Sequence, residues 1–560
     1  MVSNRPEGRA RTTFLAAGPC KPALTRPTFR GSSAALMLPL LSASAASCCG
    51  AVIACLLATR VGAVGAEPKV ARPAVLHVTL AKGIEMALAK NFAIQVERFQ
   101  PQIAQAQVTQ ELGRFDPRLE LSAQRNEQTT RSVFSRFPPG YELPPGATPP
   151  RDVFTALRHF SLNQAAREDR FALGVAGITP WGTDYGLSLG STNRAGTEND
   201  FQDQWQSDAT LDVRQPLLQG FGSDSNLSSL RIARNNALVS EWQLRQRIID
   251  IITETVFVYN ELHLAHENLR VATGFRDLAR QLLSDNTKRA EIGVMSPLNI
   301  TTARAEAASR EEAVILSRRA VKDNENLLKQ LITNDLQRIL DVGIEIERPP
   351  SVPFRADVPA GINDALQVRP DYRQAILEIE NRRITLAFRK DQALPRFDLQ
   401  ASLSALGFDN DLGTSASRVP KRDQTAWTIG AIFSVPIPNR EGRGAVVAAQ
   451  LSSAQALVNL QRLEQQIVVD VDNASGQIIT SRQRIESTEV ARQLAQESHA
   501  AGEERLRAGT GTTFEALELQ RKLAEAEFAE LRARADYNKA VSEYHRQTGT
   551  ALQVHRVTIQ

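Results

Sequence analysis

Residues 83–88 are Gly-Ile-Glu-Met-Ala-Leu and residues 361–366 are Gly-Ile-Asn-Asp-Ala-Leu, so four of six positions agree at an offset of 278. The same offset, without a gap, carries Pro-Arg-Leu-Glu-Leu at residues 117–121 onto Pro-Arg-Phe-Asp-Leu at residues 395–399. Repeated agreement at one offset indicates an internal repeat. We therefore interpret the chain as two copies of one structural unit.

The second matched segment opens a β-strand pattern in each copy. Apolar and polar residues alternate over residues 119–123, 185–190 and 397–404, which gives a strand one apolar and one polar face. An ordinary β-sandwich shows the same pattern. Because these strands are few and lie between very long helices, a β-barrel shared between subunits, with lipid outside and water inside, fits better.

Each copy continues with an unusually long helical pattern. Apolar or small residues recur largely at spacings of three and four over residues 248–282 and 463–485, as in an amphipathic helix with a sustained seam. No Pro occurs in residues 217–296 or 439–560. A helix of about 65 residues would be about 100 Å long, far longer than the helices of typical globular domains.

Both long helical patterns are interrupted by a short turn and then resume. In each turn a Gly is followed three residues later by a hydroxyl residue: Gly293 by Ser296, and Gly509 by Thr512. Gly predicts the end of one helix, Ser or Thr the start of the next, and Pro297 suits a first helical turn. Each unit is therefore predicted to be helix, strands, long helix, tight turn and return helix.

The two copies differ in the strand region. The segment Pro117–Pro216 of the first copy is about 58 residues longer than its counterpart Pro395–Pro436. The extra residues include a polar stretch, 125–170, with six Pro, which predicts a mobile loop. They also include two further strand candidates, 171–178 and 184–191. An even number of added strands preserves the up-and-down direction of the repeat.

The first 66 residues have a composition of their own. They hold seven Lys or Arg and one Glu, so the basic character of the chain belongs to them and predicts no nucleic-acid partner. An apolar run at 34–58, followed by Val-Gly-Ala at 64–66, predicts a secretory signal peptide. A transmembrane anchor is one alternative. Another is lipid attachment at Cys55, since residues 52–55 resemble a bacterial lipobox.

The sequence offers little catalytic chemistry. All four Cys precede residue 60, which excludes disulfides, thiolate nucleophiles and Cys-ligated metals from the remainder. The motifs of zinc proteases, serine hydrolases and phosphate loops are missing. His263 and His266 could hold a metal with Glu261 and Glu267, but solvated histidines on a helix face are favoured. We expect neither an enzyme nor a cofactor nor a metal site.

With these features, the chain resembles the TolC-type outer-membrane efflux family, the outer membrane factors. The resemblance rests on the duplicated Gly-Ile-x-x-Ala-Leu opening, the Pro residues that bound the strand regions, and the two helical breaks, and it covers about residues 75–550. It implies a mainly α fold with a membrane β-barrel part. A long antiparallel α-helical coiled-coil tunnel would join a β-barrel shared between three subunits, built from two tandem structural repeats.

The resemblance also implies the domain boundaries. Residues 1–66 would be the signal peptide and leader, 67–350 the first repeat, 351–550 the second repeat and 551–560 a short C-terminal tail. In the family, four strands from each of three chains give a barrel of twelve. The extra hairpin of the first copy departs from that pattern and would either enlarge the barrel or project from it.

The implied function is an outer-membrane channel of a tripartite efflux or type I secretion system in a Gram-negative-type bacterium. The homotrimer would be a passive exit duct for small molecules, metal ions or proteins, with its tunnel in the periplasm. Its partners would be outer-membrane lipid, a periplasmic adaptor (membrane fusion) protein and an inner-membrane transporter. A periplasmic helical-hairpin adaptor or scaffold without channel activity is the alternative, and a secreted enzyme the third.

The resemblance assigns two groups of site residues. The helical turns would form the periplasmic tip of the tunnel and contact the adaptor, although ordinary helix capping explains them too. These turn positions are Gly293, Val294, Ser296, Gly509, Thr510 and Thr512. Glu515 and Glu518, three apart on one helix face, match an acidic pair that lines the closed entrance. Such carboxylates attract cations and raise one another's pKa, but a solvated helix face is the alternative. Gly511 stands where some members hold a gate-locking Arg, so no lock is implied there.

Overall fold

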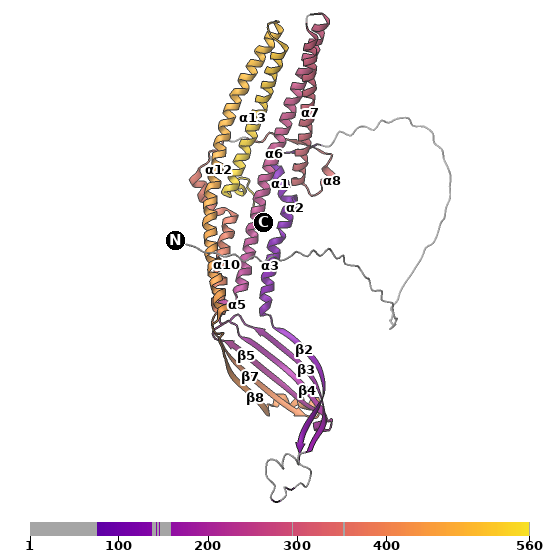
Figure 1. Cartoon of the computed structure of the whole chain (residues 1–560), viewed down its shortest axis with the longest axis vertical. Helices are drawn as coiled ribbons and strands as arrows, with labels where there is room; N and C mark the ends of the chain where they lie inside the picture. The colour runs from indigo at the N-terminus through magenta and orange to yellow at the C-terminus, as the bar shows by residue number, and fades with distance from the viewer. Residues whose placement is uncertain are drawn as a thin grey trace, which may run out of the picture. The chain divides into compact units, whose positions relative to one another are not determined.

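The computed structural model describes residues 75–136, 142, 145, 158–293, 295–350 and 353–558. The signal peptide and leader expected at 1–66, with the lipidation candidate Cys55, lie outside these residues, and so does Val294. All described residues belong to one compact unit, Ala71–Gln560. The fold is mainly helical with a sheet at one end of the helices (Figure 1).

Helices and strands follow the order predicted for two tandem repeats. The first repeat contains β1 (Val75–Val78), α1 (Leu80–Lys90), α2 (Phe92–Glu97), α3 (Phe99–Leu112), the 3-10 helix Gly113–Phe115, β2 (Arg118–Arg136), β3 (Arg158–Ile178), β4 (Asp184–Gly196), the 3-10 helix Thr197–Asn199, β5 (Gln204–Pro216), α5 (Ser223–Asn226), α6 (Ser228–Glu291), α7 (Pro297–Ile332), α8 (Leu336–Ile339) and β6 (Gly343–Ile346). The second contains α9 (Val358–Val368), α10 (Pro370–Gln392), β7 (Arg396–Asp409), α11 (Leu412–Arg418), the 3-10 helix Val419–Lys421, β8 (Gln424–Ser434), α12 (Arg440–Arg507), α13 (Thr513–Thr548) and α14 (Ala551–Val554).

The long helices confirm the helical periodicity of the sequence. Helix α6 has 64 residues and α12 has 68, and each packs along a return helix of 36 residues, α7 and α13 respectively. The two helical hairpins meet where Val271 and Phe275 of α6 pack against Leu523 and Ala524 of α13. Within the described ranges, no helix combines the length and apolar composition needed to cross a membrane.

The duplicated Gly-Ile-x-x-Ala-Leu motif begins at the fourth residue of α1 and of α9, where its small residues allow close packing. Ala87 and Ala365, equivalent in the repeat, are both completely buried. The first belongs to a core formed with α6 and α7, and the second to a core formed with α12 and α13. The motif therefore anchors the first helix of each repeat against its own long helical hairpin.

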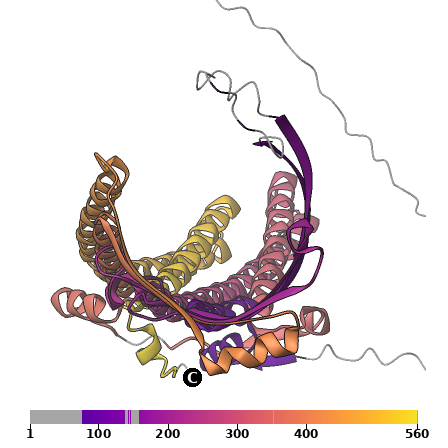
Figure 2. The same ribbon diagram turned by 90° about the horizontal axis from the view of Figure 1, so that it is seen from below.

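Strands β2, β3, β4, β5, β7 and β8 form one six-stranded sheet in that order. Every neighbouring pair is antiparallel, so the sheet runs up and down throughout. The two additional strand candidates of the first copy, 171–178 and 184–191, are confirmed as parts of β3 and β4. Figure 2 shows that the sheet is curved and that β2 and β3 continue its curve.

The prediction of a mobile loop over 125–170 is wrong for most of that stretch. Residues 125–136 belong to β2 and residues 158–170 to β3, and β2 pairs with β3 over its whole length. Backbone hydrogen bonds hold this ladder, and polar side chains pair across it, as Arg125 does with Asp169 at 2.5 Å. The polar composition was therefore a poor guide, and five of the six Pro lie outside the described residues.

Candidate functional site

The turns between the long helices and their return helices lie at the end of the molecule away from the sheet (Figure 1). Gly293 and Gly509 have φ angles of +78° and +77°, the left-handed region that favours Gly. The Ser296 hydroxyl accepts a hydrogen bond from Leu298 N–H at 3.3 Å, and the Thr512 hydroxyl accepts one from Glu515 N–H at 3.1 Å. The capping roles predicted from the sequence are confirmed.

Backbone hydrogen bonds within the second turn also hold its conformation. The N–H groups of Thr510 and Gly511 both donate to the Arg505 carbonyl at 3.0 Å. These bonds satisfy one of the last carbonyls of α12, which would otherwise lack a partner. The turn positions Gly293, Ser296, Gly509, Thr510 and Thr512 are all exposed.

Each tip also exposes large apolar side chains, which sequence reasoning missed. Leu298 and Phe514 occupy the second residue of α7 and α13, so they are equivalent positions in the two repeats. Both are more than 70% exposed, as is Ile292 in the first turn. The available signal was an apolar residue two positions after each N-cap. Ile292 and Leu298 thus expose apolar surface at the first tip, and Phe514 does so at the second.

Glu515 and Glu518 lie in the first two turns of α13 and are half-buried. They do not pair with each other in this chain. Glu515 accepts a hydrogen bond from Arg505 at 3.0 Å, across the turn. Glu518 accepts one from Arg521 at 2.6 Å, and this bond holds the pKa of Glu518 below its usual value. Within one chain, each of the two carboxylates is thus paired with an arginine.

The ion pair of one arginine can be predicted from the sequence, but that of the other cannot. Arg521 follows Glu518 by three residues on one helix, a spacing that predicts an ion pair. Arg505 lies on α12, ten residues before its partner, and only the geometry of the turn brings it to Glu515. The second tip therefore carries two acid–arginine pairs in addition to the exposed Phe514.

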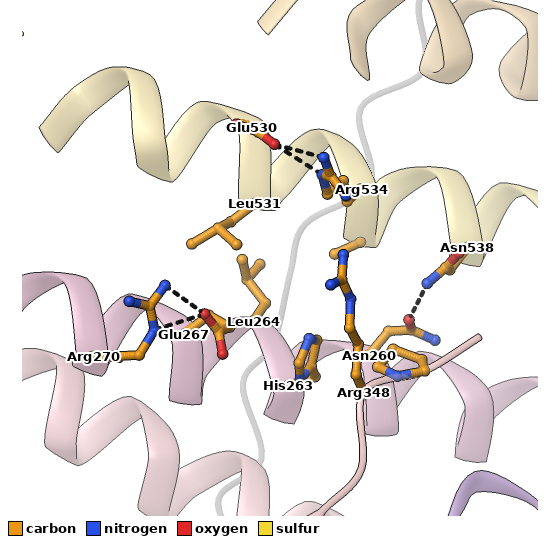
Figure 3. Close-up of a pocket in the computed structure, with 12 residues that line it drawn as sticks. Asn260, His263, Leu264, Glu267, Arg270, Arg348, Glu530, Leu531, Arg534 and Asn538 are labelled. Carbon is orange, nitrogen blue, oxygen red and sulfur yellow. Dashed lines mark hydrogen bonds and ion pairs between the residues drawn. The ribbon is translucent and has the colours of Figure 1, made fainter. Parts of the chain in front are cut away.

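Farther from the tips, a cavity of about 410 Å³ lies between α6 and α13 (Figure 3). Four of its charged side chains form ion pairs: Glu267 with Arg270 at 2.9 Å, and Glu530 with Arg534 at 2.8 Å. Burial lowers the pKa of His263, which also lines the cavity. Within the described ranges, no group of three His, Cys, Asp or Glu side chains is placed to hold a metal ion. The cavity therefore lies at the contact between the two repeats, where ion-paired side chains line it.

The sheet has two chemically different faces. One row of side chains crosses all six strands in register, and each member is apolar and at least 37% exposed. This row, the apolar row, consists of Leu119, Val175, Leu187, Leu211, Leu403 and Trp427. On the opposite face, Arg214 forms ion pairs with Asp184 at 3.2 Å and Asp398 at 2.8 Å. The sheet thus separates an apolar surface from a polar one.

A family model described as outer membrane efflux protein matches residues 156–334 and 361–549. The chain belongs to this family. The family and fold indicated by the resemblance are confirmed, including the construction from tandem repeats. The two long helical hairpins and the sheet with one apolar and one polar face agree with membership in a family of outer-membrane transport proteins. Comparison with curated proteins gives no match.

Solved structures of outer-membrane channels have the same fold as this efflux protein. The CmeC outer membrane channel of Campylobacter jejuni is 18% identical, with a TM-score of 0.62, over 84% of this chain and 86% of that one. VceC of Vibrio cholerae is 15% identical, with a TM-score of 0.58, over 84% and 96%. The MtrE outer membrane channel of Neisseria gonorrhoeae is 16% identical, with a TM-score of 0.57, over 84% and 89%.

Proposed function

We propose that this efflux-family protein is the outer-membrane channel of a tripartite efflux or type I secretion system. It acts as a homotrimer and as a passive exit duct for small molecules, metal ions or proteins. An inner-membrane transporter supplies the energy and is joined to the channel through a periplasmic adaptor. The sheet lies in the outer membrane of a Gram-negative-type bacterium, and the helical hairpins extend into the periplasm.

The apolar row is the observation that carries this proposal. A sheet with apolar side chains on one face and ion-paired polar side chains on the other suits lipid on one side and water on the other. Strands β2 and β8 are the two edges of the sheet in one chain. Edge backbone groups cannot stay unpaired in lipid, so copies must join edge to edge. A periplasmic helical scaffold without channel activity would have no use for an exposed apolar row.

Two neighbouring residues of β5 test the membrane assignment. Leu211 belongs to the apolar row, while Thr210 faces the other side. We expect Leu211→Arg to prevent insertion, because an Arg near the membrane midplane costs about 2–4 kcal/mol per chain. Thr210→Arg should leave insertion intact.

The measurement is outer-membrane fractionation, followed by planar-bilayer recording of the purified full chain. Discrete channels from the wild type and from Thr210→Arg, but not from Leu211→Arg, are the expected result. A wild-type chain that stays monomeric and soluble without detergent, and never conducts, would exclude the channel and favour the scaffold.

The exposed tips supply the adaptor contact in this proposal. The contact positions are Gly293, Val294, Ser296, Gly509, Thr510 and Thr512, to which Leu298 and Phe514 are added for their exposed apolar surface. Glu515 and Glu518 line the entrance of the pore between the tips. Their half-buried position and their arginine partners support a site with a defined charge pattern.

A further inference from the structure

The sheet contains two strands more than the four per chain that the family resemblance implied. Strands β3 and β4 lie between β2 and β5 and are paired on both sides. The pairing of β3 with β4 runs without interruption from Ala166 opposite Gly196 to Ile178 opposite Asp184. The pairing of β4 with β5 covers Asp184 to Arg194. The extra hairpin is therefore an integral part of the sheet.

The extra hairpin also carries the same surface as its neighbours. Val175 of β3 and Leu187 of β4 stand opposite each other and continue the apolar row between Leu119 and Leu211. Leu173 and Leu189 form a second exposed apolar pair beside them. A hairpin that projected from the membrane into water would have no physical reason to extend the row. Its apolar side chains suit the wall of a barrel.

Helix attachment locates the insertion in the molecule. Near the sheet, α3 packs against α6, α6 against α10, and α10 against α12. Strand β2 follows α3, β5 precedes α6, β7 follows α10 and β8 precedes α12. The extra hairpin thus lies between the strands attached to two adjacent helices, and it widens the sheet without separating those helices.

The widths of the two layers then agree. Adjacent helices pack 8–10 Å apart, so four helices from each of three copies would form a ring of roughly 100–120 Å. Strands are spaced about 4.8 Å apart and tilt by about 40° in barrels, so six strands from each copy give a circumference of roughly 110 Å. A barrel of eighteen strands is therefore compatible with a ring of twelve helices.

We propose that three copies close a barrel of eighteen strands, six from each chain, by pairing the β8 edge of one copy with the β2 edge of the next. This inference rests on the proposed homotrimer. Because six is even, β2 and β8 run in opposite directions, so the pairing between copies is antiparallel like every pairing within the chain. A barrel of this size is about as wide as the ring of helices.

Disulfide cross-linking of the full chain in native membranes tests which strand meets β8. No Cys follows residue 55, so residues 56–560 contribute no thiol other than those introduced. One set of variants joins β2 to β8 and pairs Leu119→Cys or Leu121→Cys with Trp427→Cys or Ile429→Cys. The control set pairs Leu187→Cys or Leu189→Cys of β4 with the same β8 positions.

Oxidation should convert at least one variant of the first set, and none of the control set, into covalent trimers. Electron cryo-microscopy of the uncross-linked wild type should then show eighteen strands. Trimers cross-linked only through β4, or a reconstruction with twelve strands, would overturn the wide barrel while keeping the homotrimeric channel. A monomer that gives no cross-link in either set would overturn both this inference and the proposed function.

Discussion

At the scale of single residues, the two copies of the duplicated Gly differ in what surrounds them. A Cβ atom added to Gly361 would lie 2.4 Å from the Tyr544 hydroxyl, which donates a hydrogen bond to the Asp357 carbonyl at 2.8 Å. A Cβ atom added to Gly83 would meet only ordinary contacts, the closest 3.4 Å from Val78. The absence of a side chain therefore has a steric reason at Gly361 and none at Gly83.

Replacing each Gly by Ala should separate these cases. Gly361→Ala displaces Tyr544 and should destabilise the protein, since overpacking costs about 1–3 kcal/mol and the gain in helix propensity offsets at most about 1 kcal/mol. Gly83→Ala should be neutral or stabilise by up to about 1 kcal/mol. Thermal unfolding of the two variants in detergent, followed by circular dichroism, measures the difference. Equal shifts in Tm would refute the steric explanation.

At the scale of elements, sequence analysis predicted the helices and turns that depend on local pattern. It missed features that depend on contacts with distant residues or on surface exposure. Periodicity predicted α6 and α12, and capping chemistry predicted both turns. The strands within 125–170 were missed because their side chains pair with residues far along the chain, such as Arg125 with Asp169, 44 positions away. Leu298 and Phe514 were missed because their significance lies in exposure, which a sequence pattern does not report.

The exposed tips should contact the adaptor through these two apolar side chains. A photo-reactive benzoylphenylalanine at position 298 or 514, introduced into the full chain in host cells, should cross-link to a periplasmic protein with a helical hairpin, identified by mass spectrometry. Leu316, an exposed apolar residue farther along α7, provides the control and should give no such adduct. Adducts at 316 equal to those at the tips would contradict a tip-specific contact.

At the scale of the whole molecule, the repeat predicted the order of elements but not the width of the sheet. The insertion in the first copy was evident as about 58 extra residues. Only the register of β3 and β4 assigns it to the same sheet. If the barrel is as wide as the tunnel, ion selectivity should be decided at the tips, where Glu515 and Glu518 stand among arginines.

Removing both acids should therefore change the selectivity of the assembled channel. In Glu515→Ala/Glu518→Ala, Arg505 and Arg521 lose these partners, so the entrance becomes more basic and the cation preference should fall or reverse. Glu486→Ala is the control, because Glu486 forms an exposed ion pair with Arg482 on α12, away from the turns. Reversal potentials under a KCl gradient across planar bilayers measure the effect. Unchanged selectivity in the double variant would show that neither acid lines the pore. It would not contradict the proposed channel, since conduction depends on the barrel and selectivity on its entrance.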